Sequence, residues 1–295
     1  MSTTIIETNS IKAWLLAARP KTLTGAASPV LIGLAMASTD GHLKFIPALL
    51  CFLFAFLMQI DANLINDYYD FKKGIDNKKR LGPKRACAEG WITMPVMRKG
   101  ILLITGLSCL TGLPLIYYGG ASMILIGMVC VVFCFLYTTL MARKGLGDIL
   151  VLVFFGIIPV CATYYIQIHQ FSWVAFTLSI ACGLAIDCLL IVNNYRDRET
   201  DAESGKMTLA VKLGERGTEQ LYLWIGIAAV VLCQIMWFDG HRAGAILPMI
   251  YLFPHITTWQ HMVKIKRGIQ LNRVLSQTAR NMFFFGILLA IGLVI

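Results

Sequence analysis

The feature that most constrains this chain is a series of long apolar stretches that recur from residue 22 to the C-terminus. Each is close to the ~20 residues that an α-helix needs to cross the hydrocarbon core of a bilayer. Only 14% of the residues are charged, against roughly 25% in an ordinary soluble domain. Because backbone polar groups in lipid must be satisfied within their own segment, the stretches predict helices. The sequence therefore excludes a water-soluble globule and predicts an all-α integral membrane protein.

The apolar stretches predict about nine transmembrane helices in one polytopic domain that covers residues 1–295. Their expected ranges are 22–38, 46–69, 101–118, 121–141, 147–167, 173–195, 219–238, 243–263 and 279–295. Two longer polar segments lie between them, and we expect acidic-motif loops at 66–100 and 193–218. Loops of this length in a compact protein are often functional.

The distribution of basic residues predicts the orientation of the chain. Of the 26 Lys and Arg residues, all except Lys44 and Arg242 fall in connections on the same side of the membrane as the N-terminus. Cytoplasmic connections carry such an excess of Lys and Arg, so the N-terminus and both acidic motifs are predicted to be cytoplasmic, on the inner (plasma) membrane. The formal net charge of +10 is then a topology signal. It requires no nucleic-acid partner.

Two clusters of oxygen-bearing side chains end the second and sixth predicted helices. Helical residues four apart share a face, with Cβ atoms about 5–6 Å apart, so pairs such as Asn66 and Asp70 can hold one cation together. Carboxylates oppose the dipole at a helix C-terminus, and oxygen ligands without His or Cys favour Mg²⁺. The alternative is a solvated acidic helix end that pairs with nearby Lys and Arg. The predicted metal ligands are Asn66, Asp67, Asp70, Asp76, Asn193, Asn194, Asp197 and Asp201.

The two clusters share the pattern Asn-x-Tyr-x-Asp at a spacing of 127 residues, from Asn66 to Asn193. Four predicted helices separate them, so both motifs lie on one face of the membrane, at the ends of helices that run in the same direction. This arrangement predicts a bundle built from two parallel pseudo-repeats. Two acid clusters that face each other can hold Mg²⁺ around one diphosphate and assist its departure.

Basic residues accompany each acidic motif, and cations that clamp phosphate oxygens belong beside Mg²⁺. The predicted diphosphate contacts are Arg85, Lys206, Lys72 and Arg196; each also has a simpler explanation as a topology residue. Asp61 and Asp187 fall inside apolar stretches, where ionisable residues are usually functional. They either serve the substrate or form a buried polar pair.

The quoted motifs resemble the UbiA superfamily of intramembrane aromatic prenyltransferases, and within it the dihydroxynaphthoate-prenylating branch of menaquinone biosynthesis. The resemblance runs along most of the chain. The segments that carry it are Trp14 to Leu23, Asn66 to Gly74, Gly82 to Arg85, Tyr137-Thr138, Gly145 to Asp148, Asn193 to Asp201 and Gly205 to Val211.

The resemblance implies a nine-helix bundle that uses Mg²⁺ to transfer a polyprenyl group from its diphosphate to an aromatic ring. The acceptor it implies is 1,4-dihydroxy-2-naphthoate, which loses its carboxyl group to give demethylmenaquinol. It further implies that Arg19 and Lys21 lie near the phosphates and Tyr137 near the allylic carbon. The residues expected to act in catalysis are Asp70, Asp197, Asp201 and Tyr137.

One departure from the superfamily concerns the first motif. Many members place its last acid four residues after the middle one, where this chain has Gly74, and Asp76 follows two residues later. Three other readings stay open on the sequence alone. The acceptor can be another ring, such as 4-hydroxybenzoate or homogentisate; the protein can be a cation-coupled transporter; or it can be a structural membrane subunit, which leaves the doubled motif without a purpose.

Overall fold

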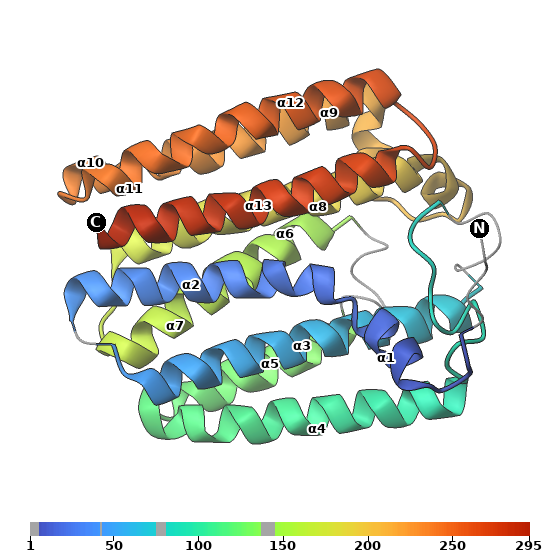
Figure 1. Ribbon diagram of the computed structural model, residues 1–295, viewed down its shortest axis with the longest axis horizontal. Coiled ribbons are helices and arrows are strands. Elements are labelled where there is room, and N and C mark those ends of the chain that lie inside the picture. Colours follow the sequence, from blue (N-terminus) through green and yellow to red (C-terminus); the bar gives the residue numbers. More distant parts are fainter. Residues whose placement is uncertain (1–5, 42, 75–80, 137–144) are drawn as a thin grey trace.

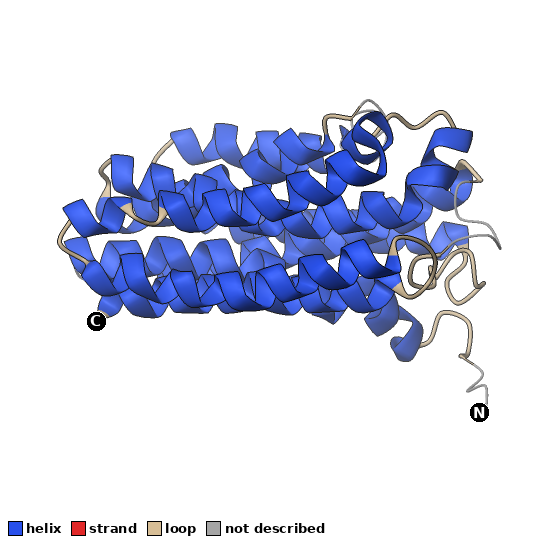
Figure 2. Cartoon of the chain, turned by 90° about the horizontal axis from the view of Figure 1, so that it is seen from above, coloured by secondary structure: helices blue, strands red, loops and turns tan. Residues whose placement is uncertain are grey.

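The computed structural model of the protein describes residues 6–41, 43–74, 81–136 and 145–295. Within these ranges all regular secondary structure is helical, as predicted. The long helices run side by side in one elongated bundle (Figure 1), and a second view confirms that they share one general direction (Figure 2). The N-terminus and the C-terminus lie at opposite ends of this bundle.

The α-helices are α1 (Ile11–Ala18), α2 (Leu23–Asp40), α3 (Phe45–Lys72), α4 (Met94–Gly119), α5 (Ser122–Leu136), α6 (Gly147–Val151), α7 (Ile158–Ile168), α8 (Trp173–Glu203), α9 (Leu209–Leu232), α10 (Ile235–Phe238), α11 (Arg242–Ile246), α12 (Leu252–Ile265) and α13 (Leu271–Val294). Shorter helical turns are η1 (Pro20–Thr22), the π-helical segment η4 (Leu152–Ile157) and η5 (Leu247–Tyr251).

Among the described residues, seven helical stretches are long and apolar enough to cross a membrane. Helix α5 and the continuous run from α11 through η5 to α12 bring the number of crossings to nine. The prediction of about nine membrane helices is therefore confirmed, with α6, η4 and α7 forming one crossing.

The two halves of the bundle repeat one arrangement, as the doubled motif predicted. Helix α3 carries the first motif and packs closely along α4, and α8 carries the second motif and packs closely along α9. Both motifs lie at the end of the bundle where the N-terminus lies (Figure 1). The last helix, α13, packs against α2 and α8 and so joins the two halves.

Helices α3 and α8 continue past the ends of the apolar stretches, so the two predicted loops are shorter than expected. Most of 193–218 is helical, because α8 continues to Glu203 and α9 begins at Leu209. In 66–100, α3 continues to Lys72 and α4 begins at Met94. The reason is that hydropathy marks where the lipid ends, whereas helical hydrogen bonds persist into polar sequence.

A close helix contact in the middle of the bundle depends on two glycines. A Cβ on Gly156 of η4 would lie 2.5 Å from the carbonyl oxygen of Ser179 and 2.7 Å from the Cα of Gly183 in α8. Small residues of this kind let membrane helices approach closely. The π-helical segment η4 therefore packs directly on α8, and π-helical turns often occur at functional sites.

Candidate active site

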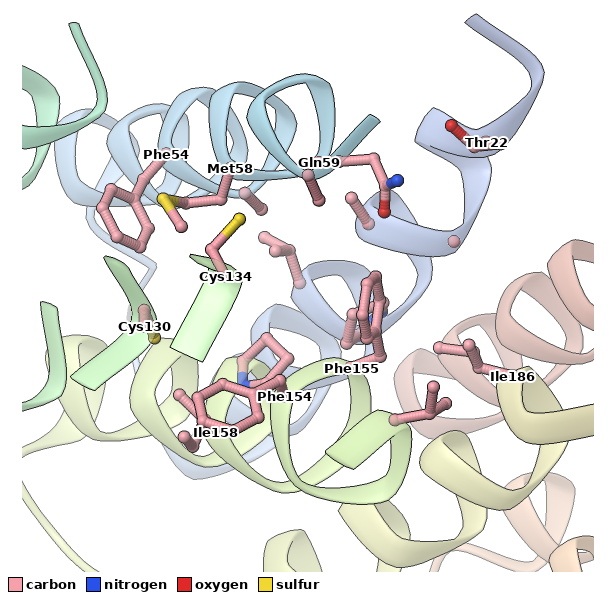
Figure 3. Close-up of a pocket in the computed structure, with 18 of the residues that line it drawn as sticks. Thr22, Phe54, Met58, Gln59, Cys130, Cys134, Phe154, Phe155, Ile158 and Ile186 are labelled. Atoms are coloured by element: carbon pink, nitrogen blue, oxygen red, sulfur yellow. The ribbon is translucent and has the colours of Figure 1, made fainter. Parts of the chain in front are cut away.

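A cavity of about 1560 Å³ lies inside the bundle, larger than the roughly 300–1,000 Å³ of an ordinary small-molecule pocket. Most of its wall is apolar and comes from α2, α3, α5, η4 and α8 (Figure 3). Residues that form this wall include Phe54, Met58, Cys130, Cys134, Phe154, Phe155, Ile158 and Ile186. Such a chamber suits a long hydrocarbon group.

Five of the predicted site residues line the cavity, and they come from both halves of the chain. They are Arg19, Lys21, Asn66, Arg85 and Asn193. Two further cations, Lys84 and Arg280, also line it, although charge patterning alone explains them as topology signals. One end of an apolar chamber therefore carries positive charge and amide groups.

Arg19 and Lys21 are positioned by a side chain that sequence reasoning did not single out. The amide of Asn63 donates hydrogen bonds to the Ala18 carbonyl oxygen and to Thr22 Oγ1, both at 2.9 Å. Thr22 Oγ1 in turn donates to the Arg19 carbonyl oxygen at 2.9 Å. These bonds hold the turn between α1 and α2 against α3, so the two cations are fixed beside the first motif.

Asp67 holds the turn that carries Arg85. Its side chain is 1% exposed, and its two oxygens accept the backbone N–H groups of Ala86 and Cys87 at 2.8 and 2.9 Å. Arg85, the preceding residue, places Nη2 3.7 Å from Asp70 Oδ2. Both Asp67 oxygens therefore serve the backbone, although Asp67 was a predicted metal ligand.

In the second motif, the Arg196 guanidinium ties several predicted residues together. Its Nε and Nη2 donate to the two oxygens of Asp197 at 2.7 and 2.6 Å. Nη2 also donates to Asn193 Oδ1, and Nη1 donates to Asn272 Oδ1, both at 2.8 Å. Arg196 is almost fully buried. It therefore orients Asn193 and Asp197, although it was predicted to contact the diphosphate.

Asn272 connects the two acidic motifs. Its Nδ2 donates to the carbonyl oxygen of Leu81, 2.8 Å away and 191 residues distant in the sequence, while its Oδ1 accepts from Arg196. The segment after the first motif is thereby joined to the second motif through α13. A single asparagine at the start of the last helix carries no sequence pattern that points to this role.

The end of α8 positions Lys206 beside Asp201. Gly205 has φ +72°, a left-handed conformation that favours glycine, and it closes the helix with a hydrogen bond from the Lys206 N–H to the Asp201 carbonyl oxygen at 2.8 Å. The Lys206 ammonium lies 3.1 Å from Asp201 Oδ2. The helix cap therefore turns the lysine back onto the carboxylate.

The remaining predicted residues occupy different environments. Asn194 is buried in α8, and Lys72 is exposed in the last turn of α3, away from the cavity wall. Asp61 is buried in α3 and accepts the Thr105 hydroxyl at 2.6 Å. Asp76 and Tyr137 lie outside the described residues.

The donors at the polar end fit Mg²⁺. Asn66 and Asn193 line the cavity, and the carboxylates of Asp70 and Asp197, one turn further along their helices, are partly exposed. Across the described part of the chain, no three His, Cys, Asp or Glu side chains converge on one point. Mg²⁺ needs no such cage, because it is usually held by one or two carboxylates together with substrate phosphates and water.

Known proteins resemble this chain along nearly its whole length. The 1,4-dihydroxy-2-naphthoate octaprenyltransferase of Escherichia coli (strain K12) is 31% identical over 292 residues, which cover 96% of this chain and 95% of that protein. The protein of the same name from Haemophilus influenzae is 33% identical over 305 residues, covering 97% and 96%.

Solved structures share the fold. The apo structure of a UbiA homolog from Aeropyrum pernix K1 superimposes with a TM-score of 0.72 at 12% identity, covering 92% of this chain and 97% of that one. A UbiA homolog from Archaeoglobus fulgidus bound to GPP and Mg²⁺ gives a TM-score of 0.62 at 13% identity, covering 96% and 99%.

The sequence profile of the UbiA prenyltransferase family matches residues 26–293, which contain both acidic motifs, seven of the nine crossings in full and most of the other two. The naphthoate prenyltransferases to which the chain is similar point to the same family. The chain is thus an integral membrane transferase that belongs to the UbiA prenyltransferase family.

Proposed function

We propose that the protein transfers a polyprenyl group from polyprenyl diphosphate to 1,4-dihydroxy-2-naphthoate, in a Mg²⁺-dependent reaction that releases CO₂ and yields demethylmenaquinol. One observation carries the proposal: the large apolar chamber has one polar end, which we call the polar pole. The polar pole is lined by Asn66 and Asn193 of the two motifs and by the cations Arg19, Lys21 and Arg85. Relatives named for this reaction, 31–34% identical, support the choice of acceptor.

The diphosphate would bind at the polar pole. Arg19, Lys21 and Arg85 line this end of the cavity and would donate hydrogen bonds to phosphate oxygens. Asn66, Asp70, Asn193 and Asp197 would hold Mg²⁺, with Asp201 near Lys206 in support. When bound, the metal supplies positive charge that stabilises the leaving diphosphate.

The reaction balances without any further reactant. The bond between the allylic carbon and oxygen breaks, and the diphosphate leaves with the electron pair. A ring carbon of the naphthoate donates its π electrons to the allylic carbon and forms the new C–C bond. The carboxyl group on that ring carbon then leaves as CO₂, and the electrons of its bond restore the aromatic ring.

The apolar wall would protect the allylic cation. Phe154 stacks on Phe133 with ring centroids 5.0 Å apart, and both line the chamber together with Phe54 and Phe155. Aromatic faces attract positive charge, and a chamber without water prevents hydrolysis of the cation. The same wall would solvate the polyprenyl chain.

We further infer that the polar pole faces the cytoplasm. The bias of Lys and Arg toward the connections on the N-terminal side supports this orientation. Both motifs and the N-terminus share one end of the bundle (Figure 1), so one orientation serves all three. Labelling of single cysteines placed at residues 9 and 240 in intact cells would test it.

Mass spectrometry of products tests the proposed reaction. The purified protein in detergent is given Mg²⁺ and a polyprenyl diphosphate, with dihydroxynaphthoate and 4-hydroxybenzoate offered in parallel. We expect a prenylated naphthoquinol without the carboxyl group, and no product after chelation of the metal. Prenylated hydroxybenzoate alone would overturn the acceptor, and no product from either ring would overturn the proposal.

A further inference from the structure

Two buried carboxylates at the contact between α6 and α8 have no role in the site described above. Asp148 is 8% exposed and Asp187 is 6% exposed. Both side-chain oxygens of Asp148 and Oδ1 of Asp187 are buried without a hydrogen-bond donor among the described residues. Burial of unpaired carboxylate oxygens is unfavourable, so these oxygens can accept hydrogen bonds from a bound ligand.

Other buried acids of this chain show how such groups are normally satisfied. Asp67 accepts two backbone N–H groups, and Asp61 accepts the hydroxyl of Thr105 at 2.6 Å. Asp67 thus has a donor for each oxygen, whereas Asp61 Oδ1 has none among the described residues, like Asp187 Oδ1. Asp148 differs from both Asp61 and Asp67, because neither of its side-chain oxygens accepts a hydrogen bond from another described side chain or amide.

The two carboxylates lie close in sequence to residues of the chamber wall, although neither is itself part of that wall. Asp148 lies one helical turn before Val151 and two turns before Phe155, which both line the cavity wall. Asp187 follows Ile186 and lies one turn before Leu190, which line it from α8. Residues three apart share a helix face, so Asp148 and Asp187 lie on the helix faces that also carry Val151 and Leu190, at the edge of the chamber wall.

Their depth separates them from the diphosphate end. Asp187 precedes Asp197 by ten residues of the continuous helix α8, or about 15 Å at 1.5 Å per residue. Helix α6 packs on α8, so the two acids lie at one helix contact. A ligand between them would sit deeper than the diphosphate, on the apolar side of it.

The chemistry of the pair favours a hydroxylated ring over a metal ion. Within the described ranges no third His, Cys, Asp or Glu joins the two carboxylates, which leaves too few ligands for a cation cage. Phenolic O–H groups donate hydrogen bonds to carboxylates, and the surrounding wall is apolar enough to take a ring.

We propose that Asp148 and Asp187 bind the hydroxyl groups of the aromatic acceptor and so orient its nucleophilic carbon toward the allylic carbon. This inference rests on the proposed function and deepens it, because it assigns the hydroxyl-binding part of the acceptor pocket. The prenyl diphosphate is held elsewhere, at the polar pole.

The test compares the two substrates in Asp148→Asn and Asp187→Asn. We expect each variant to raise the KM for dihydroxynaphthoate by about tenfold or more, the effect of weakening a charged hydrogen bond, with the KM for prenyl diphosphate unchanged within about twofold. Asp61→Asn, which removes a buried carboxylate with a Thr105 partner, is the matched control and leaves both KM values unchanged.

A second readout does not depend on how well the variants turn over. The dimethyl ether of dihydroxynaphthoate cannot donate hydrogen bonds, so it should compete with the acceptor at least about tenfold more weakly than the parent ring in the wild-type protein. In either Asp variant this preference for the free hydroxyls should shrink. A preference that stays intact in both variants, or equal KM changes for both substrates, would overturn the inference.

Failure of the proposed function gives a different result. A wild-type protein that prenylates hydroxybenzoate in place of the naphthoate overturns the acceptor, and hydroxybenzoate with its methyl ether then decides the role of the two acids. If one variant does not remain monodisperse in detergent, the other variant and the wild-type ether comparison still decide it.

Discussion

Asp67 Oδ1 accepts the backbone N–H of Cys87 at 2.9 Å, across a turn that begins twenty residues later in the sequence. The second oxygen accepts the N–H of Ala86. Through these bonds, the buried acid of the first motif fixes the segment on which Arg85 approaches Asp70. The most buried carboxylate of this motif therefore shapes the site through the backbone.

Asp67→Asn should loosen this turn. The asparagine side chain accepts only through its amide oxygen, so the N–H of either Ala86 or Cys87 would face the side-chain NH₂ group. The lost hydrogen bond should lower the free energy of unfolding by about 1–3 kcal/mol. We expect a lower melting temperature, faster proteolysis near residue 85 and a higher KM for prenyl diphosphate. Glu89→Gln, which breaks the exposed Lys84–Glu89 ion pair, should change the melting temperature little. Equal stability of Asp67→Asn and the wild type would contradict the assigned role.

Asp70→Ala and Asp197→Ala should each abolish turnover while the protein stays folded. Each removes a carboxylate that we assign to Mg²⁺ beside a cavity-lining asparagine, Asn66 or Asn193. We expect a loss of at least about 10²-fold in kcat, typical for removal of a group that stabilises transition-state charge. Single-turnover assays and gel filtration measure the two properties. Near-normal activity in either variant would refute a metal site shared by the two motifs.

Arg196→Lys should reduce both activity and stability. The planar guanidinium of Arg196 donates hydrogen bonds to Asp197, Asn193 and Asn272 at the same time. A lysine ammonium cannot reproduce this geometry. A hydrogen bond to a charged group contributes about 1.5–3 kcal/mol, and the lysine loses several of them, so we expect a lower melting temperature and a reduced kcat. The control is Arg267→Lys, whose 67% exposed side chain pairs with Glu199, and it should stay within about 0.5 kcal/mol of the wild type.

Gly156→Ala should displace the part of the chamber wall that η4 forms. The added methyl group would meet the Ser179 carbonyl oxygen and the backbone of Gly183, and overpacking of this kind costs about 1–3 kcal/mol. Because Phe154 and Phe155 flank the same turn, we also expect slower turnover. Gly106→Ala is the matched control, since a Cβ there meets open space. Thermal unfolding of both variants that matches the wild type would show that the close contact is unimportant.

The residue of the second motif that matches Asp70 depends on whether the motifs are aligned by sequence pattern or by helix end. The shared pattern aligns Asp70 with Asp197, yet the helix ends align Asp70 with Asp201, because each lies three residues before the C-cap of its helix. Helix α8 simply runs one turn further past its motif than α3 does. The sequence pattern cannot reveal this offset, since glycine-closed helix ends depend on Gly74 and Gly205 rather than on the repeated residues.

The features that the sequence alone predicts are local properties of the chain. Apolar length predicts crossings, the placement of Lys and Arg predicts an orientation, and the i, i+4 spacing of Asn66 and Asp70 predicts a shared helix face. Each depends on residues close together in sequence, so each is legible from the sequence.

The remaining features depend on which helices pack together. The bond from Asn272 to the Leu81 carbonyl oxygen joins residues 191 apart, and the shared helix contact of Asp148 and Asp187 requires α6 to lie on α8. The same holds for Asp67, whose oxygens turn to backbone amides and away from the cavity. No residue type or spacing encodes these contacts, because they arise only when nine helices bury their faces against one another and every buried polar group needs a partner.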